Sequence, residues 1–277
     1  MGFKDQQKTH WDRVAAGWEA WAAWTDRNFR PITDWLVDAL ALQEGHRVLD
    51  VACGAGYPAL SIAPRVGSSG RVVALDVSKG MTEIVARRSR SIGLDNVVTR
   101  VGDAEGLPFA DRSFDAAINT YGLMFCEDPG LAIREALRVL EPGGRLAVVV
   151  WDDRSLSPFF TSIGDIAASL LALPSPPGGG PGPWRYAPAG SLDALLWSNR
   201  CADVRIESRV MTCEFTSVDE YVRLFADVAW RPRMEALTPE AFGEFRNAVA
   251  EVTAPYVDDG TLRLVAASRC ASARKPS

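Results

Sequence analysis

The segment from Val48 to Gly56 constrains the fold of this chain more than any other. An apolar strand carries an acid, Asp50, near its end and then breaks into a turn that contains Gly54 and Gly56. Glycine has no Cβ, so such a turn lets a ligand approach the backbone closely. A helix is predicted over 57–66, and the N–H groups of its first turn are free to meet negative charge. This order of strand, turn and helix predicts an α/β sheet that binds a ligand at the carboxyl ends of its strands.

Two further acids follow strands of the same kind. Asp76 ends an apolar strand over 71–76, where an acid commonly accepts hydrogen bonds from a ribose hydroxyl pair. Gly102-Asp103-Ala104 follows a third strand, 97–101, and offers a carboxylate and an amide edge to an adenine amino group. The three positions together predict a cofactor that contains a nucleoside.

The identity of the nucleoside depends on the residues around the turn. Gly54-x-Gly56-x-x-Ala59 also fits a relaxed dinucleotide fingerprint, which leaves an NAD-dependent oxidoreductase as an alternative. Asp50 argues against it, because a carboxylate near the first glycine repels a pyrophosphate and attracts a cationic amino-acid end. Pro58 suits the first position of a helix that does not hold a diphosphate.

The joint pattern resembles the class I S-adenosylmethionine (SAM) methyltransferases, in the branch with quinone-biosynthesis and many small-molecule methylases. The resemblance covers about 45–152 and rests on Leu49-Asp50-x-Ala52-Cys53-Gly54-x-Gly56, Asp76, Gly102-Asp103-Ala104 and Leu140-Glu-Pro-Gly-Gly144. It implies SAM as cofactor. It also implies a Rossmann-like α/β fold: seven mostly parallel strands, helices on both faces, and a last antiparallel strand beside the fifth.

The rest of the chain suggests how this core is extended. Strands are expected over 46–51, 71–76, 97–101, 114–119 and 145–151 with helices between them, and the sixth and seventh strands near 205 and 265. Residues 1–44 form an N-terminal helical lid in which Pro31 separates two helices, and 45–153 form the cofactor-binding core. Residues 154–255 form an inserted cap that includes the last core helix and the sixth strand, with a Pro/Gly-rich insert or hinge at 174–183. Residues 256–277 hold the last strand and a basic tail.

Composition limits the function classes. A net charge of −5 and the lack of a basic patch argue against nucleic acid as a partner. Five cysteines without a CxxC pair and two histidines predict neither a metal site nor a disulfide scaffold. The polar N-terminus predicts no signal peptide, and no apolar run approaches the roughly 18–20 residues of a membrane span, so a cytoplasmic protein is expected. The sequence leaves open whether the chain forms a homodimer.

The resemblance assigns cofactor contacts by motif position. Asp50 and the turn after it are expected to hold the methionine end of the cofactor. Asp76 is expected to hold the ribose, and the residues after the second and third strands are expected to contact the adenine. Trp18, on the N-terminal helix of the expected lid, is expected to line the site beside the sulfonium. Purely structural roles remain as alternatives for some of these residues. Asp76 and Asp103 also fit turns, Met81 also fits the buried face of a helix, and Cys53 also fits a small apolar residue of the core. The full set is Trp18, Asp50, Ala52, Cys53, Gly54, Gly56, Asp76, Val77, Met81, Asp103, Ala104, Asn119 and Met124.

Catalytic residues are harder to assign, because methyl transfer needs mainly alignment and exclusion of water, and a base only when the acceptor keeps its proton. His10 on the lid and Tyr121 after the fourth strand are the candidates. Asn119-Thr-Tyr121-Gly122 departs from the Asn/Asp-Pro-Pro-Tyr of amide and amino-group methylases, which puts such substrates in doubt. We expect a SAM-dependent methyltransferase that acts on a small-molecule acceptor in specialised metabolism. The alternatives are a quinone-type C-methyltransferase and a SAM-binding protein that catalyses a non-methylating reaction such as cyclisation.

Overall fold

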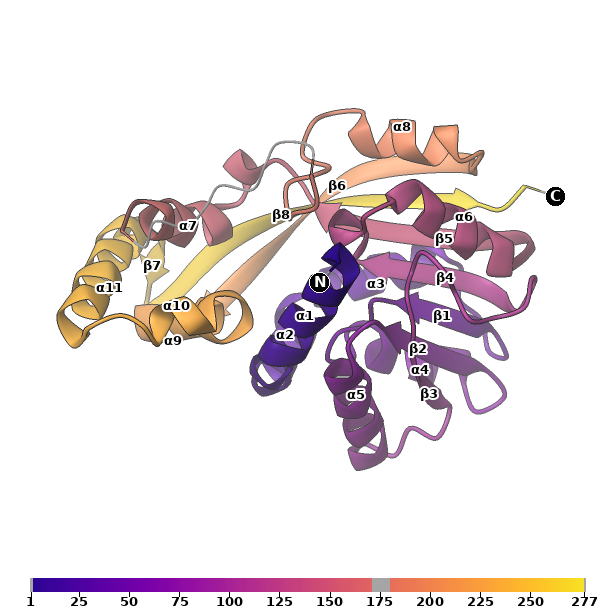
Figure 1. The fold of residues 1–277 in the computed structure, drawn as a ribbon, viewed down its shortest axis with the longest axis horizontal. Helices are drawn as coiled ribbons and strands as arrows, with labels where there is room; N and C mark the ends of the chain where they lie inside the picture. The colour runs from indigo at the N-terminus through magenta and orange to yellow at the C-terminus, as the bar shows by residue number, and fades with distance from the viewer. Residues whose placement is uncertain (1, 171–179, 277) are drawn as a thin grey trace.

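The computed structural model describes residues 2–170 and 180–276, in which a twisted sheet with helices on both faces continues into a second lobe of helices (Figure 1). Seven strands lie in the order β3-β2-β1-β4-β5-β8-β6, and a short strand, β7, pairs with β8. The strands are β1 (Arg47–Val51), β2 (Arg71–Asp76), β3 (Val97–Val101), β4 (Phe114–Thr120), β5 (Leu140–Trp151), β6 (Ala202–Phe215), β7 (Val257–Asp258) and β8 (Thr261–Arg274). The predicted α/β class and Rossmann-like sheet are confirmed.

The direction of the strands also follows the expectation. Strands β1 to β5 run parallel to one another, whereas β8 runs antiparallel to both β5 and β6. Parallel strands end at the same edge of a sheet, so the loops that follow β1, β2, β3 and β4 meet there.

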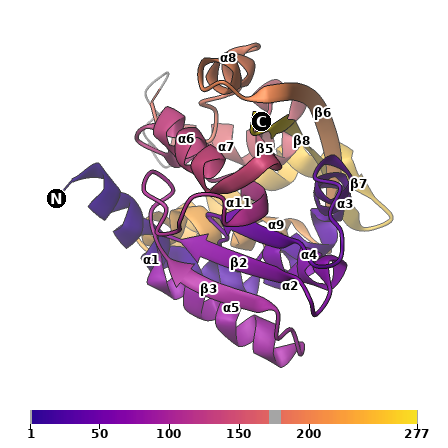
Figure 2. The same ribbon diagram turned by 90° about the vertical axis from the view of Figure 1, so that its right-hand side faces the viewer.

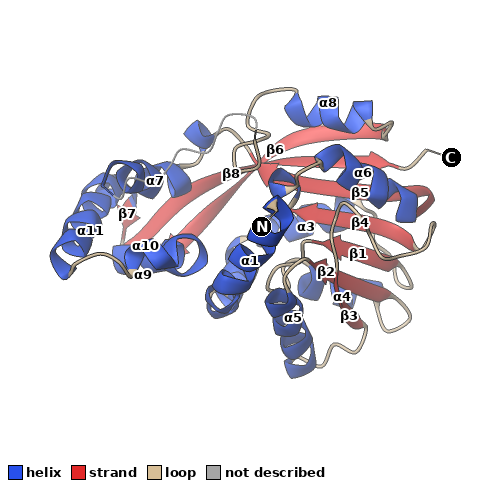
Figure 3. Ribbon diagram, in the orientation of Figure 1, coloured by secondary structure: helices blue, strands red, loops and turns tan. Residues whose placement is uncertain are grey.

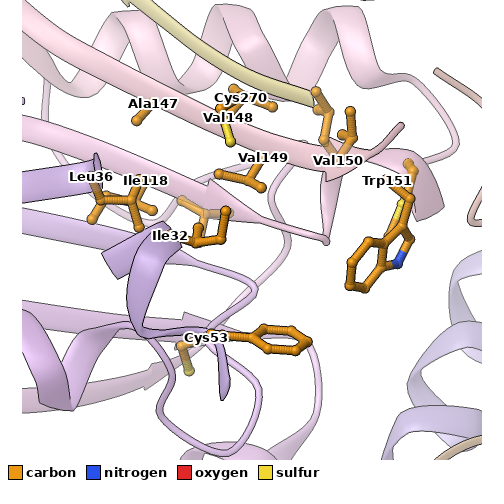
Figure 4. Packing of buried hydrophobic residues seen from close by; sticks show 14 of the residues in the cluster. Ile32, Leu36, Cys53, Ile118, Ala147, Val148, Val149, Val150, Trp151 and Cys270 are labelled. Carbon is orange, nitrogen blue, oxygen red and sulfur yellow. The ribbon is translucent and has the colours of Figure 1, made fainter. Parts of the chain in front are cut away.

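Helices cover the two faces of the sheet, with α3 and α4 on one face and α6 and α8 on the other (Figures 1 and 2). Leu36 and Ile32 of α3 lie against Ile118 and Val149 of the central strands, and all four side chains are buried (Figure 4). Burial of such aliphatic side chains is the main stabilising term for the sheet. The helices are α1 (Phe3–Ala20), α2 (Ala22–Asn28), α3 (Arg30–Ala39), α4 (Ala59–Val66), α5 (Lys79–Ser91), α6 (Pro129–Val139), α7 (Pro158–Leu170), α8 (Ser191–Ser198), α9 (Val218–Phe225), α10 (Arg231–Met234) and α11 (Pro239–Thr253).

The second lobe is built on the far halves of β6 and β8 (Figure 3). β8 pairs with β5 only from Ser268 onward, but it pairs with β6 as far back as Leu262, so the two strands extend beyond the core sheet. Helices α7, α9 and α11 pack at that end around Phe215, Tyr221 and Phe245, which are fully buried. The lobe is therefore an extension of the sheet and shares its framework.

The N-terminal segment differs from the prediction. It forms three helices, and the breaks fall at Trp21 and Phe29, whereas a single break at Pro31 was expected. Pro31 lies in the first turn of α3, where its missing N–H has no helical partner to lose.

Three strand and helix boundaries also differ. The helix expected from Tyr57 begins at Ala59, and β5 begins at Leu140, five residues before the expected start at 145. The tail is part of the sheet, because the Lys275 N–H donates to the Gly144 carbonyl at 2.9 Å and β8 reaches Arg274. Pairing with a neighbouring strand overrides the polar composition of these segments. Most of the Pro/Gly-rich run at 174–183 lies outside the described residues.

Helix α1 lies between the core and the lobe. It packs against α5 of the core on one side and against the π-helical turn η3 (Ala226–Trp230) of the lobe on the other. At Gly17 the backbones approach so closely that a Cβ would lie 2.2 Å from the Asp227 carbonyl oxygen. Trp21 Nε1 donates to Asp227 Oδ2 at 2.9 Å beside this contact. One helix thus ties the two parts together.

We predict that Gly17→Ala lowers the free energy of unfolding by about 1–3 kcal/mol, because the new methyl group forces α1 away from η3. Gly243→Ala in α11 is the matched control, since a Cβ there meets nothing within 4 Å. The control should raise stability by about 0.5–1 kcal/mol through helix propensity. Urea unfolding measures the change in unfolding free energy for both variants. Equal changes in the two variants would contradict the close contact at Gly17.

Candidate functional site

The turn after β1 has a backbone that leaves one side open. Ala52, Gly54 and Gly56 adopt positive φ angles of 62°, 51° and 110°. A Cβ built on Gly54 would meet nothing within 4 Å, so the chain itself does not fill the space beside this residue. Ala52 is a non-glycine residue in the left-handed region, a kind of strain that clusters at binding sites. The turn is shaped to let a ligand lie against its backbone.

Asp50 lies at the base of this turn and is fully buried. Its Oδ2 accepts a hydrogen bond from the Ala59 N–H at 3.2 Å, whereas Oδ1 is buried without a partner among the described residues. Burial, and to a lesser degree the charge of Asp76, raises the pKa of Asp50 well above its usual range. A buried carboxylate oxygen without a donor is costly, so the site fits a ligand that brings a cationic donor.

Asp76 joins the loops that follow β1 and β2. Its two oxygens accept from the Gly54 N–H and the Ser78 N–H, each at 2.9 Å. Burial raises its pKa to about 6, although these backbone donors favour the charged form. Each carboxylate oxygen has a second lone pair, so Asp76 keeps the capacity to accept from a pair of hydroxyl groups.

Helix α1 lies across these loops through polar contacts that the sequence analysis missed. Asp12 Oδ1 accepts from Ser78 Oγ at 2.5 Å and from the Gly80 N–H at 3.2 Å. Lys4 Nζ pairs with Asp103 at 2.7 Å and with Glu105 at 2.9 Å. Asp103, predicted to meet adenine, therefore has a protein cation on one oxygen. Partners so far apart in sequence leave no local signal, and only the Ser78 N-cap of α5 could have been expected.

An apolar cluster lies between α1 and the glycine-rich turn. Met81 and Ile84 of α5 pack with Ala55 of the turn and Ala15 of α1, and Trp11 and Trp18 pack against this cluster. The Trp18 Nε1 donor is buried and has no partner among the described residues. Sequence analysis placed Trp18 and Met81 at the cofactor, and the fold brings both to the turn.

The loop after β4 touches the same turn. Asn119 Oδ1 accepts from the Gly122 and Leu123 N–H groups at 3.1 and 2.7 Å, which fixes the loop. A Cβ on Gly122 would lie 2.4 Å from Ala52 Cβ, so the two loops are in direct contact. Tyr121 has a φ of 59°, and its hydroxyl shares a 2.8 Å hydrogen bond with Ser268 Oγ.

The other residues singled out by sequence take varied places. Burial, and then the charges of Asp76 and Asp50, raises the pKa of the Cys53 thiol, and Met124 is buried in the core cluster. Val77 and Ala104 are half-buried in the loops after β2 and β3. His10 is exposed on α1, with its ring 5.0 Å from that of Trp11. Its pKa is lowered by partial burial and by Arg13.

Most of the N-terminal tryptophans are structural. Trp24 stacks on Phe215 at 4.9 Å between ring centroids and donates from Nε1 to the Glu214 carbonyl at 2.8 Å. Trp35 donates to Glu207 of β6. Trp21, Trp24 and Trp35 therefore hold the N-terminal helices to the lobe and to β6, and only Trp11 and Trp18 reach the loops at the carboxyl edge.

Two cavities lie away from this edge. One, of about 270 Å³, is lined by His46, Asp115 and the Glu141–Arg145 turn at the amino ends of the strands. The other, of about 160 Å³, lies between α3 and α4. Within the described residues, no group of three acid, cysteine or histidine side chains is placed to hold a metal ion. No described helix combines the length and apolar character needed to cross a bilayer.

Comparison with known proteins agrees with this geometry. Residues 49–148 match the family described as a methyltransferase domain. The chain is 42% identical over 126 residues to the demethylmenaquinone methyltransferase of Renibacterium salmoninarum, which is 46% of this chain and 50% of that protein. The chain spans about half the length of the curated relatives it matches.

Solved structures extend the likeness beyond the core. The match to the YcgJ protein from Bacillus subtilis covers 88% of this chain and 98% of the YcgJ chain, with a TM-score of 0.60 at 20% sequence identity. The [4+2]-cyclase SpnF covers 89% of this chain and 80% of its own, with a TM-score of 0.55 at 26% identity. Together with the strand order and the glycine-rich turn, the family match and the curated relatives show that the core of this chain, residues 49–148, is similar to methyltransferases.

Proposed function

We propose that this chain is a SAM-dependent methyltransferase that acts on a small-molecule acceptor, in specialised metabolism. The observation that carries the proposal is Asp50, a buried carboxyl with one oxygen unpartnered, beside a glycine turn with open space at Gly54. This arrangement suits the cationic amino-acid end of SAM and would oppose a pyrophosphate. The family match at 49–148 supports the same assignment.

The remaining cofactor contacts follow the chain's own geometry. Asp76 would accept from the ribose hydroxyls while it holds Gly54 and Ser78, and Val77 and Met81 would flank the adenine. Asp103 and Ala104 would meet the adenine edge, with Asp103 shared with Lys4. We propose that residues 1–44 act as the lid, because α1 contacts the loops after β2 and β3, and that the lobe in 154–255 is the cap on the acceptor.

When bound, SAM supplies an electrophilic methyl group, so the protein has to align the acceptor and exclude water. Tyr121 is better placed for this than His10, since its loop touches Ala52 whereas His10 faces solvent. Burial raises the pKa of Tyr121 well above its ordinary value, so the hydroxyl stays protonated. We propose that it orients the acceptor as a hydrogen-bonding group and not as a base.

The Asp50→Asn variant tests the cofactor assignment. The amide keeps the size of the side chain but loses the charge that faces the ammonium, so affinity for S-adenosylhomocysteine should fall about tenfold or more. Asp95→Asn, at an exposed loop position, is the control and should bind normally. Isothermal titration measures both, and full affinity in Asp50→Asn would remove this residue from the site.

Cofactor affinity should also depend on pH. With a raised pKa of about 6, Asp76 is a carboxylate above that pH and becomes protonated below it. The neutral acid is a poorer acceptor for the ribose, so the affinity for S-adenosylhomocysteine at pH 5 should be about a tenth of that at pH 8. The Asp76→Asn variant should bind S-adenosylhomocysteine weakly, and its affinity should no longer change between pH 5 and pH 8. If the variant keeps the pH dependence of the unmodified chain, Asp76 is not the group that titrates.

For Tyr121, we predict that a substitution lowers the rate of product formation but leaves cofactor binding unchanged. Tyr121→Phe keeps the ring on Trp151 and removes the hydroxyl, so the rate of product formation should fall about tenfold or more, within the range for a positioned polar group. Affinity for S-adenosylhomocysteine should stay the same. A variant with the full rate would leave Tyr121 as a packing residue only.

A non-methylating reaction is the second candidate, favoured by the likeness to SpnF, a [4+2]-cyclase. Such a role is compatible with a fold whose catalysis is largely positional. The product mass separates the two: a methyltransferase adds one methyl group, whereas a cyclase leaves the mass unchanged. A quinone-type acceptor, as in the name of the Renibacterium relative, remains an alternative within the first proposal.

A further inference from the structure

Six aromatic side chains form a continuous strip from the end of β4 into the lobe. Tyr121 stacks on Trp151 at 4.0 Å between ring centroids, and Trp151 meets Phe160 at 4.6 Å. Phe160 contacts Trp184 at 5.1 Å and Phe225 at 6.0 Å. Phe225 contacts Trp230 of η3 at 5.1 Å. We call these six residues the aromatic strip.

Burial along the strip is uneven. Trp151 and Phe225 are only 8% and 6% exposed, whereas Tyr121, Phe160, Trp184 and Trp230 are half-buried. Trp151 lies at the end of β5, where its ring extends away from the aliphatic side chains of Ala147 to Val150 (Figure 4). Two buried rings therefore support four rings that keep part of their surface accessible to a flat ligand.

One end of the strip adjoins the candidate cofactor site. Tyr121 precedes Gly122, whose backbone lies against Ala52 of the glycine-rich turn. A molecule that lies along the strip can thus reach the point where the loops after β1 and β4 meet.

The part of the strip that comes from the cap is held in place by β8. Arg269 Nη1 donates to the Tyr186 and Pro188 carbonyls at 2.7 and 3.0 Å, and its Nη2 donates to the Ala187 carbonyl at 3.2 Å. The Gly182 N–H donates to the Met124 carbonyl at 2.9 Å. These bonds bracket Trp184, so its ring is positioned by the sheet and by the loop after β4.

Two ion pairs lie next to the strip, and Arg185, beside Trp184, donates a hydrogen bond to the Cys126 carbonyl. Asp152, which follows Trp151, binds Arg269 at 2.6 Å, and both side chains are largely buried. Asp227 of η3 binds Arg231 at 2.9 Å. A charged ligand would find no free counter-charge in these pairs, and the rings form a strip of stacked and edge-on contacts rather than a cage around a cation.

We propose that the acceptor is an uncharged molecule with a flat ring system that lies along the aromatic strip, with the atom to be methylated at the Tyr121 end. This inference rests on the proposed function and gives its acceptor a chemical class. Flat rings gain most from stacking on Trp and Tyr faces, and a neutral ligand leaves the two ion pairs intact.

The test uses the whole chain saturated with S-adenosylhomocysteine and 2-naphthol as a neutral, flat probe, with binding measured by isothermal titration. Trp184→Ala should weaken 2-naphthol about five- to tenfold, since one ring of the surface is removed. Trp197→Ala is the matched control, because Trp197 is 63% exposed on α8 and outside the strip. Tetramethylammonium should bind more weakly than 2-naphthol to the unmodified chain.

The outcomes are distinct. Failure of the unmodified chain to bind 2-naphthol, tighter binding of tetramethylammonium, or equal losses in the Trp184 and Trp197 variants would each overturn the inference. Failure to bind S-adenosylhomocysteine would instead count against the proposed function. If circular dichroism shows Trp184→Ala to be unfolded, Trp230→Ala takes its place with the same expected loss.

Discussion

The site depends on two carboxyl groups that the sheet buries at its carboxyl edge. Asp76 fixes the glycine-rich turn by accepting from the Gly54 N–H, and Asp50 holds the start of α4 through the Ala59 N–H. Burial raises the pKa of both carboxyl groups, because placing a charge in a protein interior costs free energy. Since Asp50 Oδ1 has no donor in the described chain, a cationic ligand is the partner that would offset this cost.

Helix α1 connects this pair of acids with the lobe. Asp12 and Lys4 bind the loops after β2 and β3, while Gly17 and Trp21 contact η3 on the other side. A movement of α1 would therefore change the loops after β2 and β3 and the lobe together. The individual ion pairs are partly exposed and weak, so the close backbone packing at Gly17 is the more stringent constraint.

Features that depend on short-range interactions could be predicted from the sequence, whereas features that depend on partners far along the chain could not. The turn at Gly54, the acid at Asp76 and the alternation of strands and helices follow from local patterns, because apolar strands and glycine turns have short-range signals, whereas the antiparallel strand beside the fifth was implied by the family resemblance. The extension of β8 to Arg274 and the pairing of Lys4 with Asp103 depend on partners far along the chain, and neither was predicted. Similarly, Trp24 and Trp35 lie in the same N-terminal segment as Trp18, and only the fold separates the structural rings from those beside the glycine-rich turn.

Under the proposed function, the lobe lets one fold serve different acceptors. The residues proposed to hold the cofactor lie on loops of the parallel strands, whereas the aromatic strip takes Phe160, Trp184 and Trp230 from segments inserted after β5 and β6. These segments rest on the continuous strands β6 and β8, so their position relative to the glycine-rich turn is set by strand pairing and by Arg269. Substitutions in the inserted rings would then change the acceptor while Asp50 and Asp76 keep the same cofactor, and the two specificities can vary independently.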